Sequence, residues 1–251
     1  MEKTVQYDCR WSDKLDEKYI NDFLFVEQTV FGDVWTREMF NRKFIENIYG
    51  LSLIVVVYVE GRPAAARSFW RNDVCKKEAY QPGDTCVISE YRGLGLFTKM
   101  TKVALEFLSG NEVIYNYPNN NSYPGYLKMG WSLVGEYYQR VLLFNNQYYK
   151  EDKEVLDIGY ARWWLLQFNG VFSIKRGKDY FLVRKNPKRP FLYILARVNK
   201  ETAALFTKTS PFAICFFMSQ KKTWYNSHLN TIHVVSRNGN LAIPLWKMDA
   251  I

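Results

Sequence analysis

The chain has 251 residues, and its basic side chains outnumber its acidic ones by 34 to 25, giving a formal net charge of +9 at pH 7. These basic residues are dispersed, and their densest cluster, residues 184–190, is expected to form a solvated turn between two apolar segments. The dispersed charge disfavours nucleic acid as the main partner. The longest apolar run, residues 53–59, is too short to span a bilayer, so no membrane partner is expected.

Cysteine and histidine are too sparse and too scattered to predict a metal site. The four cysteines form no CxxC pair, and the two histidines form no HExxH motif. The first residues contain no apolar core of signal-peptide length. We therefore expect a cytoplasmic protein without a metal, in which all four thiols are free: Cys9, Cys75, Cys86 and Cys215.

Periodicity in the first half predicts a mixture of strands and helices. Residues 4–11 alternate as a strand does, and Ser12 or Asp13 can cap a helix that extends to residue 31. Thr36 can cap a second helix. The remaining elements expected in this half are two strands around a turn at Glu60–Gly61, a strand from residue 84, a helix at 96–108, a strand at 113–118, a short helix before Gly130 and two strands within 131–149.

A charged segment with weak periodicity, residues 148–154, predicts a domain boundary. We therefore expect two domains, residues 1–148 and residues 149–251. The second half predicts a helix within residues 154–170, another within 199–209, and strands at 171–177, 179–186, 191–198, 212–220, 231–239 and 240–246. This strand-rich α/β unit is expected to be either a degenerate copy of the first domain or an appended sheet.

A strand, two closely spaced glycines and a helix follow one another within residues 84–108. Gly93 and Gly95 come directly after Arg92 and open the helix. Unpaired backbone N–H groups and the helix dipole attract anions at such a position, and glycine lets a bulky anion approach the backbone. A diphosphate site and a plain tight turn both fit these residues. The dinucleotide pattern fails because Thr98 stands where a third glycine is needed.

This segment, CVISEYRGLGLFTKM, resembles the signature of the GNAT superfamily of N-acetyltransferases. Gly93 and Gly95 match the two small residues of its loop, whereas Glu90 stands where the family has Gln or Arg. The resemblance implies that loop amides bind the pyrophosphate of acetyl-CoA, assisted by Arg92, and that the preceding strand pairs with the pantetheine arm. The implied cofactor-binding residues are Cys86, Val87, Ile88, Arg92, Gly93, Leu94, Gly95, Leu96, Phe97 and Thr98.

A second segment, NNNSYPGYLKMGW, resembles another motif of the same superfamily at the expected distance downstream. Asn119, Ser122, Tyr126 and Gly130 match that motif, and Trp131 replaces its phenylalanine. The resemblance implies that Asn119 and Ser122 contact the pantetheine arm. It also implies that Tyr126 lies near the sulfur and acts as the general acid. Together the two motifs extend the resemblance over roughly residues 1–145.

The resemblance implies a GNAT fold, with a mixed, mostly antiparallel, twisted central sheet flanked by helices. The implied activity is N-acetyl transfer from acetyl-CoA, as co-substrate, to a primary amine of a small molecule such as an amino sugar. Asp84 is the favoured general base, and Glu78 and Glu90 remain alternatives. Cys86 lies among apolar residues, where an inert buried thiol is expected.

Two alternatives to this activity remain open at this point. The same fold can use another acyl donor, namely a longer acyl-CoA, an acyl carrier protein or an aminoacyl-tRNA. The departure at Glu90 also fits a non-catalytic module that retains the CoA site. The sequence leaves open whether the chain forms a homodimer, as well as which amine accepts the acyl group.

Overall fold

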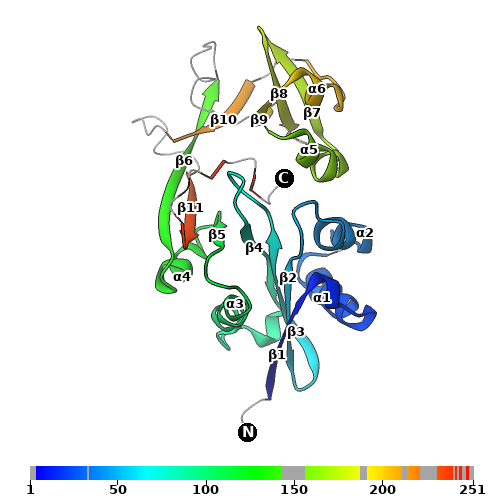
Figure 1. Ribbon diagram of the computed structural model, residues 1–251, viewed down its shortest axis with the longest axis vertical. Helices are drawn as coiled ribbons and strands as arrows, with labels where there is room; N and C mark the ends of the chain where they lie inside the picture. The colour runs from blue at the N-terminus through cyan, green and yellow to red at the C-terminus, as the bar shows by residue number, and fades with distance from the viewer. Residues whose placement is uncertain are drawn as a thin grey trace. The chain divides into compact units, whose positions relative to one another are not determined.

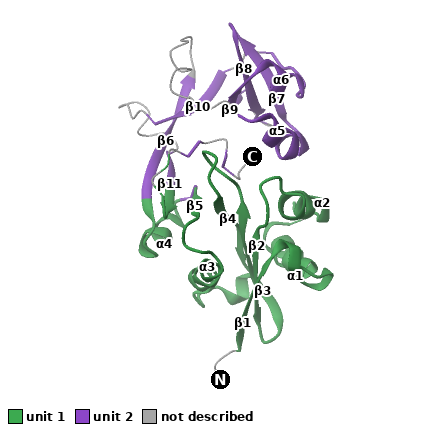
Figure 2. Cartoon of the chain, in the orientation of Figure 1, with its two compact units in different colours: residues 1–116, 120–132, 235–241 green, residues 117–119, 133–234, 242–251 purple. Residues whose placement is uncertain are grey.

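The computed structural model describes residues 4–32, 34–142, 156–186, 191–210, 214–220, 231–239, 241, 243–244 and 247–248. The chain divides into two compact units, coloured separately in Figure 2. The first unit comprises residues 1–116, 120–132 and 235–241, and the second comprises residues 117–119, 133–234 and 242–251. The expected boundary between residues 148 and 149 lies outside the described residues.

The first unit is built on a mixed sheet, as the sequence predicts. Neighbouring strands are antiparallel from β1 to β4, β5 is parallel to β4, and the last residues of β11 are antiparallel to β5. The strands are β1 (Val5–Trp11), β2 (Leu53–Val59), β3 (Arg62–Arg71), β4 (Ala79–Val87), β5 (Val113–Asn116) and the end of β11 (Thr231–Arg237), of which residues 235–237 belong to this unit.

Strands β2 and β3 form the buried centre of this sheet. Nearly every residue of β2 is buried, and so are the seven residues from Ala64 to Trp70 of β3. A strand covered on both faces shows a continuous apolar run instead of strict alternation, and the segment LIVVVYV has this pattern. Arg67, in the middle of β3, interrupts the apolar character of the buried region.

Two helices on one face of the sheet begin at side-chain caps. Helix α1 (Glu17–Phe31) begins after Asp16, whose side chain accepts a hydrogen bond from the Tyr19 backbone N–H. The expected start at Ser12 or Asp13 is wrong, because those residues form a separate short 3-10 turn. Helix α2 (Arg37–Phe40) begins after Thr36 as predicted, and a π-helical turn continues it over Asn41–Ile45.

Helices cover both faces of the first unit's sheet (Figure 1). On one face, α1 and α2 enclose an aromatic cluster in which Phe23 packs edge-on against Trp35, Phe40 and Phe44. On the other face, α3 (Leu96–Glu106) inserts Leu96, Met100 and Ala104 into the main core. A short helix, α4 (Tyr123–Lys128), follows β5.

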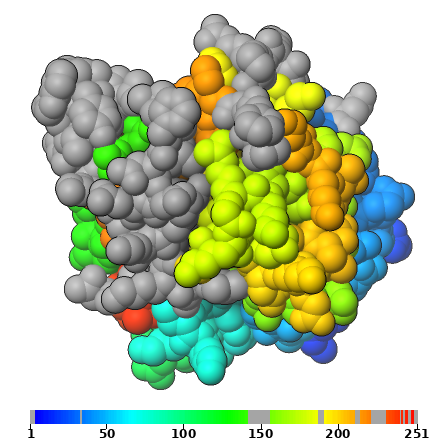
Figure 3. Space-filling view, turned by 90° about the horizontal axis from the view of Figure 1, so that it is seen from above, coloured from blue at the N-terminus to red at the C-terminus, as the bar shows by residue number. Residues whose placement is uncertain are grey.

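The second unit is a strand-rich α/β unit, as expected for this part of the chain. Its strands lie in the order β6-β10-β9-β8-β7, and β9 and β10 are parallel. In Figure 3, residues 171–186 and 191–210 are seen in yellow-green to orange. The elements are β6 (Ser132–Leu142), α5 (Ile158–Trp163), β7 (Val171–Arg176), β8 (Asp179–Lys185), β9 (Phe191–Val198), α6 (Lys200–Ala204) and β10 (Ile214–Ser219).

The division of the chain differs from the single expected boundary in two places. Residues 133–142 group with the second unit, because β6 pairs with β10 through Tyr138–Leu142. Residues 235–241 group with the first unit, because Val235–Arg237 pair with β5. Where two strands were expected within 131–149, the described residues contain one, β6. In the part of the chain that is described, no helix has the length and apolar character needed to cross a bilayer.

Candidate active site

Strands β4 and β5 separate after a short paired stretch. They run parallel and pair only at Ala79–Val113 and Tyr80–Ile114, although β4 continues to Val87. Beyond Tyr80, the edge of β4 that faces β5 therefore has no strand partner on that side among the described pairings. Such an edge can hydrogen-bond an extended, amide-containing ligand in the manner of an added strand.

The loop after β4 presents backbone to open space at the start of α3. Gly93 and Gly95 have φ values of 83° and 71°, in the left-handed region that favours glycine. A Cβ placed on either glycine would meet no atom within 4 Å. Gly95 is the N-cap of the 11-residue α3 and supplies no side-chain cap. The first-turn N–H groups therefore remain suited to an anion such as a pyrophosphate.

The side chains of this loop divide between solvent and core. Arg92 and Leu94 are exposed, and the Arg92 Nε donates to the Val87 carbonyl oxygen at 3.2 Å. Leu96 is buried in the core, and Phe97 packs against it, so these two residues anchor α3 and can serve a ligand only through their backbones. Thr98 is half-buried.

Glu90, the departure from the GNAT pattern, lies on the surface of this loop. The side chain is exposed in the short turn Ser89–Tyr91. A hydrogen bond with this carboxylate raises the pKa of Tyr91 above its ordinary value. Glu90 therefore contacts its own turn and leaves the amides from Gly93 onward uncovered.

The hydroxyl of Tyr126 lies at the end of β5 and is held by two donors. The Arg67 Nη2 donates to it at 2.6 Å, and the Asn116 side-chain amide also donates to it. The Tyr126 ring packs edge-on against Phe97 at 5.7 Å and Trp131 at 4.8 Å between centroids. Tyr126 thus contacts α3 through Phe97, β3 through Arg67 and β5 through Asn116. The sequence motifs related Tyr126 to the glycine loop before α3, but not to Arg67 or Asn116.

Asp84 is placed in a buried ion pair. Both of its carboxylate oxygens lie 2.9 Å from the Lys43 Nζ, and the Ser68 hydroxyl donates to the same carboxylate. Its backbone φ of 44° is unusual for a residue other than glycine and falls where the pairing of β3 and β4 shifts register. The role of Asp84 as general base stays a prediction, and its occupied oxygens count against it.

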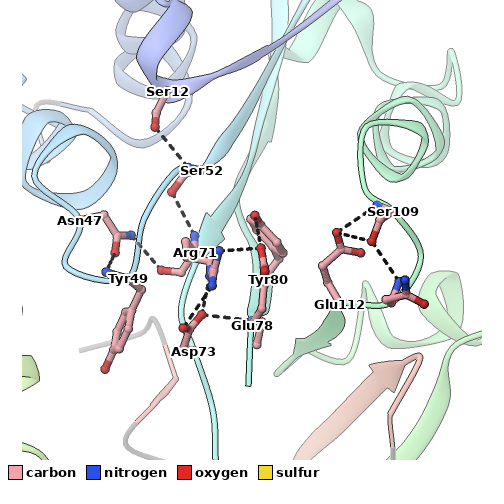
Figure 4. A network of polar contacts seen from close by, with 12 residues as sticks. Ser12, Asn47, Tyr49, Ser52, Arg71, Asp73, Glu78, Tyr80, Ser109 and Glu112 are labelled. Atoms are coloured by element: carbon pink, nitrogen blue, oxygen red, sulfur yellow. Dashed lines mark hydrogen bonds and ion pairs between the residues drawn. The ribbon is translucent and has the colours of Figure 1, made fainter. Parts of the chain in front are cut away.

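Glu78, the second alternative base, belongs to a polar network near the start of β4 (Figure 4). Its Oε1 accepts from the Arg71 Nη1 at 2.6 Å and from the Tyr80 hydroxyl at 3.1 Å. Arg71 also contacts Asp73 through two nitrogens. This network joins the ends of β3 and β4, and a structural role explains every contact of Glu78 in it.

Cys86 is buried and inert, as its apolar sequence context predicts. Its Sγ donates to the Glu27 Oε1 at 3.1 Å. Burial, reinforced by the neighbouring Glu27 carboxylate, raises the pKa of the Cys86 thiol far above its ordinary value. Cys86 can therefore serve a ligand through its backbone alone, like Val87 and Ile88 beside it.

The remaining predicted residues lie around α4. Ser122 precedes α4 and is half-buried, and the exposed Asn119 groups with the second unit. Sequence reasoning missed Arg67 and Asn116, the two residues that hold Tyr126. The available signal was a lone arginine within the buried apolar run of β3. Within the described ranges, no three acidic, histidine or cysteine side chains are grouped as metal ligands would be.

Solved structures share this architecture over nearly the whole chain. A GCN5-related N-acetyltransferase from Anabaena variabilis aligns with a TM-score of 0.55 at 13% identity, covering 93% of this chain and 72% of its own. A putative acetyltransferase from Pyrococcus horikoshii aligns with a TM-score of 0.54 at 11% identity, covering 96% and 94%. A probable N-acyltransferase from Enterococcus faecalis aligns with a TM-score of 0.54 at 12% identity, covering 97% and 74%.

Neither a protein-family profile nor a curated protein matches the sequence. The likeness is therefore one of fold, and it is carried by backbone geometry at very low sequence identity. The chain has the fold of the GCN5-related N-acetyltransferases, as its two motifs predict.

Proposed function

We propose that the protein is an acyl-CoA-dependent N-acyltransferase that moves an acetyl group to a primary amine of a small molecule. The observation that carries this proposal is the edge of β4 beyond Tyr80, which has no β5 partner in the described pairings and leads into the glycine loop, together with the Tyr126 hydroxyl at the end of β5. The fold of several acetyltransferases supports it. An amino sugar is the acceptor class that we propose.

The chain offers suitable groups for each part of the donor. The unpaired edge of β4 at Cys86–Ile88 can hydrogen-bond the amides of a pantetheine arm. The amides from Gly93 to Thr98 can bind a pyrophosphate at the start of α3, with Arg92 adding positive charge. Both roles use backbone groups, which explains how Glu90 is tolerated beside them.

Tyr126 is suited to donate a proton to a departing thiolate. Arginine and the asparagine NH2 group can only donate hydrogen bonds, so both contacts of the Tyr126 hydroxyl use its lone pairs. The hydroxyl hydrogen is therefore left for a third group. In the proposed reaction that group is the sulfur of the leaving CoA, and Tyr126 is the general acid.

Deprotonation of the acceptor amine is assigned to water. The Asp84 oxygens are already engaged by Lys43 and Ser68, and Glu78 is engaged by Arg71 and Tyr80. Glu90 is exposed on the loop. A solvent route needs none of these ion pairs to break before the amine attacks.

Thermal unfolding with acetyl-CoA and acetyl-pantetheine tests the donor site. Saturating acetyl-CoA is expected to raise the Tm, since a ligand bound only by the native state must stabilise it. Arg92→Ala is expected to weaken acetyl-CoA binding about tenfold, by losing one charge-assisted contact. It is expected to leave binding of acetyl-pantetheine, which lacks the pyrophosphate, unchanged. No stabilisation of the native protein by acetyl-CoA contradicts the proposal.

A panel of donors and a tyrosine variant separate the alternatives. If activity is found only with a longer acyl-CoA, an acyl carrier protein or an aminoacyl-tRNA, acetyl-CoA is not the donor but acyl transfer to an amine stands. Binding of acetyl-CoA without transfer to any amine of an amino-sugar panel favours a non-catalytic module. In an active preparation, Tyr126→Phe is expected to lower kcat about 100-fold. An unchanged kcat contradicts the general-acid assignment.

A further inference from the structure

Arg67 is a buried cation that forms no ion pair with any carboxylate in the described part of the chain. It lies in the middle of β3 and has no solvent exposure. Its Nη2 donates to Tyr126, whereas its Nε and Nη1 have no hydrogen-bond partner among the residues that the structure describes. No described carboxylate forms an ion pair with it. Burying an unbalanced charge is costly, so this arrangement calls for an explanation beyond folding.

Another arginine on the same strand shows the usual arrangement. Arg71 lies four residues further along β3, and the alternation of a strand puts both arginines on the same face. Arg71 is balanced by Asp73 and by Glu78, the latter at 2.6 Å (Figure 4). This strand therefore carries one arginine that carboxylates balance and one that, within the described ranges, donates to a tyrosine hydroxyl alone.

Aromatic rings surround the Arg67 guanidinium instead of carboxylates. Its central carbon lies 4.6 Å from the Phe97 ring centroid, 5.3 Å from that of Phe69 and 5.6 Å from that of Tyr126. The negative faces of such rings stabilise a cation without neutralising its charge. The positive potential of Arg67 is thus retained next to the Tyr126 oxygen.

We propose that Arg67 is a positioning residue that holds Tyr126 and stabilises the negative charge that develops on the CoA sulfur when the carbon–sulfur bond breaks. This inference rests on the proposed function. A fixed cation in a dry site acts strongly on charge that develops nearby and needs no reorganisation at the moment of reaction. Arg67 acts through Tyr126, whose hydroxyl it orients from the lone-pair side.

The step balances with the groups named. The amine nitrogen bonds to the thioester carbon, and the carbon–sulfur bond breaks with its electron pair on sulfur. The Tyr126 hydroxyl proton moves to that sulfur and leaves a tyrosinate facing Arg67 and Asn116. The amine loses its extra proton to water, and the tyrosinate regains a proton from water.

Titration of the thiol of bound CoA tests this proposal without an acceptor, by following thiolate absorbance against pH. The native protein is expected to shift the titration midpoint about one pH unit below that in Arg67→Met, because an opposite charge nearby favours the thiolate. Arg67→Lys keeps the charge and is expected to restore most of the shift. Arg71→Met is the matched control, expected to leave the midpoint unchanged.

Stability and kinetics separate this role from a purely structural one. Arg67→Met is expected to keep or raise the Tm, because an unbalanced buried charge is replaced by an apolar side chain. With a working acceptor amine, Arg67→Met is expected to lower kcat about tenfold and to leave the KM for acetyl-CoA unchanged. A tenfold change corresponds to the shift of about one unit expected for the pKa of the leaving thiol. Arg67→Met is expected to add nothing to Tyr126→Phe, because both act on one proton transfer.

The outcomes distinguish the two proposals. If CoA does not bind the native protein, the proposed function fails and this inference falls with it. If CoA binds but its midpoint is the same in the native protein and Arg67→Met, Arg67 has no such role and the function stands. A lower Tm of Arg67→Met with an unchanged midpoint makes Arg67 a structural residue and overturns the inference.

Discussion

Two buried cations in the first unit are stabilised in different ways. Lys43 meets the Asp84 carboxylate at 2.9 Å and lies over the Trp70 ring. Arg67 meets aromatic rings and a hydroxyl. Removing one member of a buried ion pair leaves an uncompensated charge, whereas removing an already unbalanced cation leaves none. At the scale of the residue, the two sites therefore predict opposite effects on stability.

Replacement of Asp84 by asparagine tests the ion pair. Asp84→Asn is expected to lower the free energy of unfolding by about 3–5 kcal/mol, because the buried Lys43 loses its ion pair with Asp84. Urea denaturation measures the loss. The double variant Lys43→Met/Asp84→Asn is the control and is expected to recover part of it. If Asp84→Asn abolishes acyl transfer at full stability, Asp84 is the general base after all.

Alkaline pH tests two other groups, the half-buried Cys9 and the buried Tyr80. Burial raises the pKa of Cys9 to about 12 and, despite the nearby Arg71, the pKa of Tyr80 to about 12. In the unfolded chain these groups ionise near their ordinary values of about 8.5 and 10. The folded state binds more protons between those limits, so stability is expected to fall as pH rises from about 9 to 11. Urea midpoints that do not change over that range contradict this expectation.

At the scale of the element, the start of α3 combines a backbone requirement with the proposed anion-binding surface. Gly95 adopts the left-handed conformation and caps the helix with its backbone. The sequence predicts this turn because two glycines directly precede an amphipathic segment. It does not show that β4 and β5 separate, because the two strands are 25 residues apart and their register depends on packing.

Substitution of Gly95 tests the conformational cost of its left-handed backbone. Gly95→Ala is expected to lower the free energy of unfolding by about 1–2 kcal/mol, since its φ of 71° is strained for a residue with a Cβ and no atom lies near that position. Gly95→Asn tolerates the conformation better and is expected to cost less. Equal losses for the two variants, measured by urea denaturation, contradict a left-handed Gly95.

At the scale of the whole molecule, the chain does not divide at one point. Val235 is fully buried in the core of the first unit with residues such as Leu53 and Met100. The Ser236 hydroxyl donates to the Ile114 carbonyl at 3.1 Å, and the Arg237 Nη1 donates to the Met129 carbonyl at 3.3 Å. The last strand therefore completes the first unit, although over 100 residues separate it from β5 along the chain.

A truncated chain tests this dependence. A fragment of residues 1–148 lacks β11 and is expected to melt well below the full chain or to aggregate, because β5 loses a neighbour and the core loses Val235. Circular dichroism and size-exclusion chromatography measure both outcomes. Addition of a peptide with residues 231–241 is expected to raise the Tm of the fragment. A fragment as stable as the full chain contradicts the observed division.

The sequence alone predicted the helix starts at Thr36 and after Gly95. Its resemblance to the GNAT superfamily implied the fold, the backbone loop proposed for an anion, and Tyr126 as the acid candidate. The helix starts and the two motifs each involve residues close together in the chain, so they can be recognised along the sequence. Tertiary structure decided that Lys43 neutralises Asp84, that Arg67 and Asn116 hold Tyr126, and that β11 completes the first sheet. Each of these is a contact between residues distant in sequence, whose register and burial arise only when the core packs.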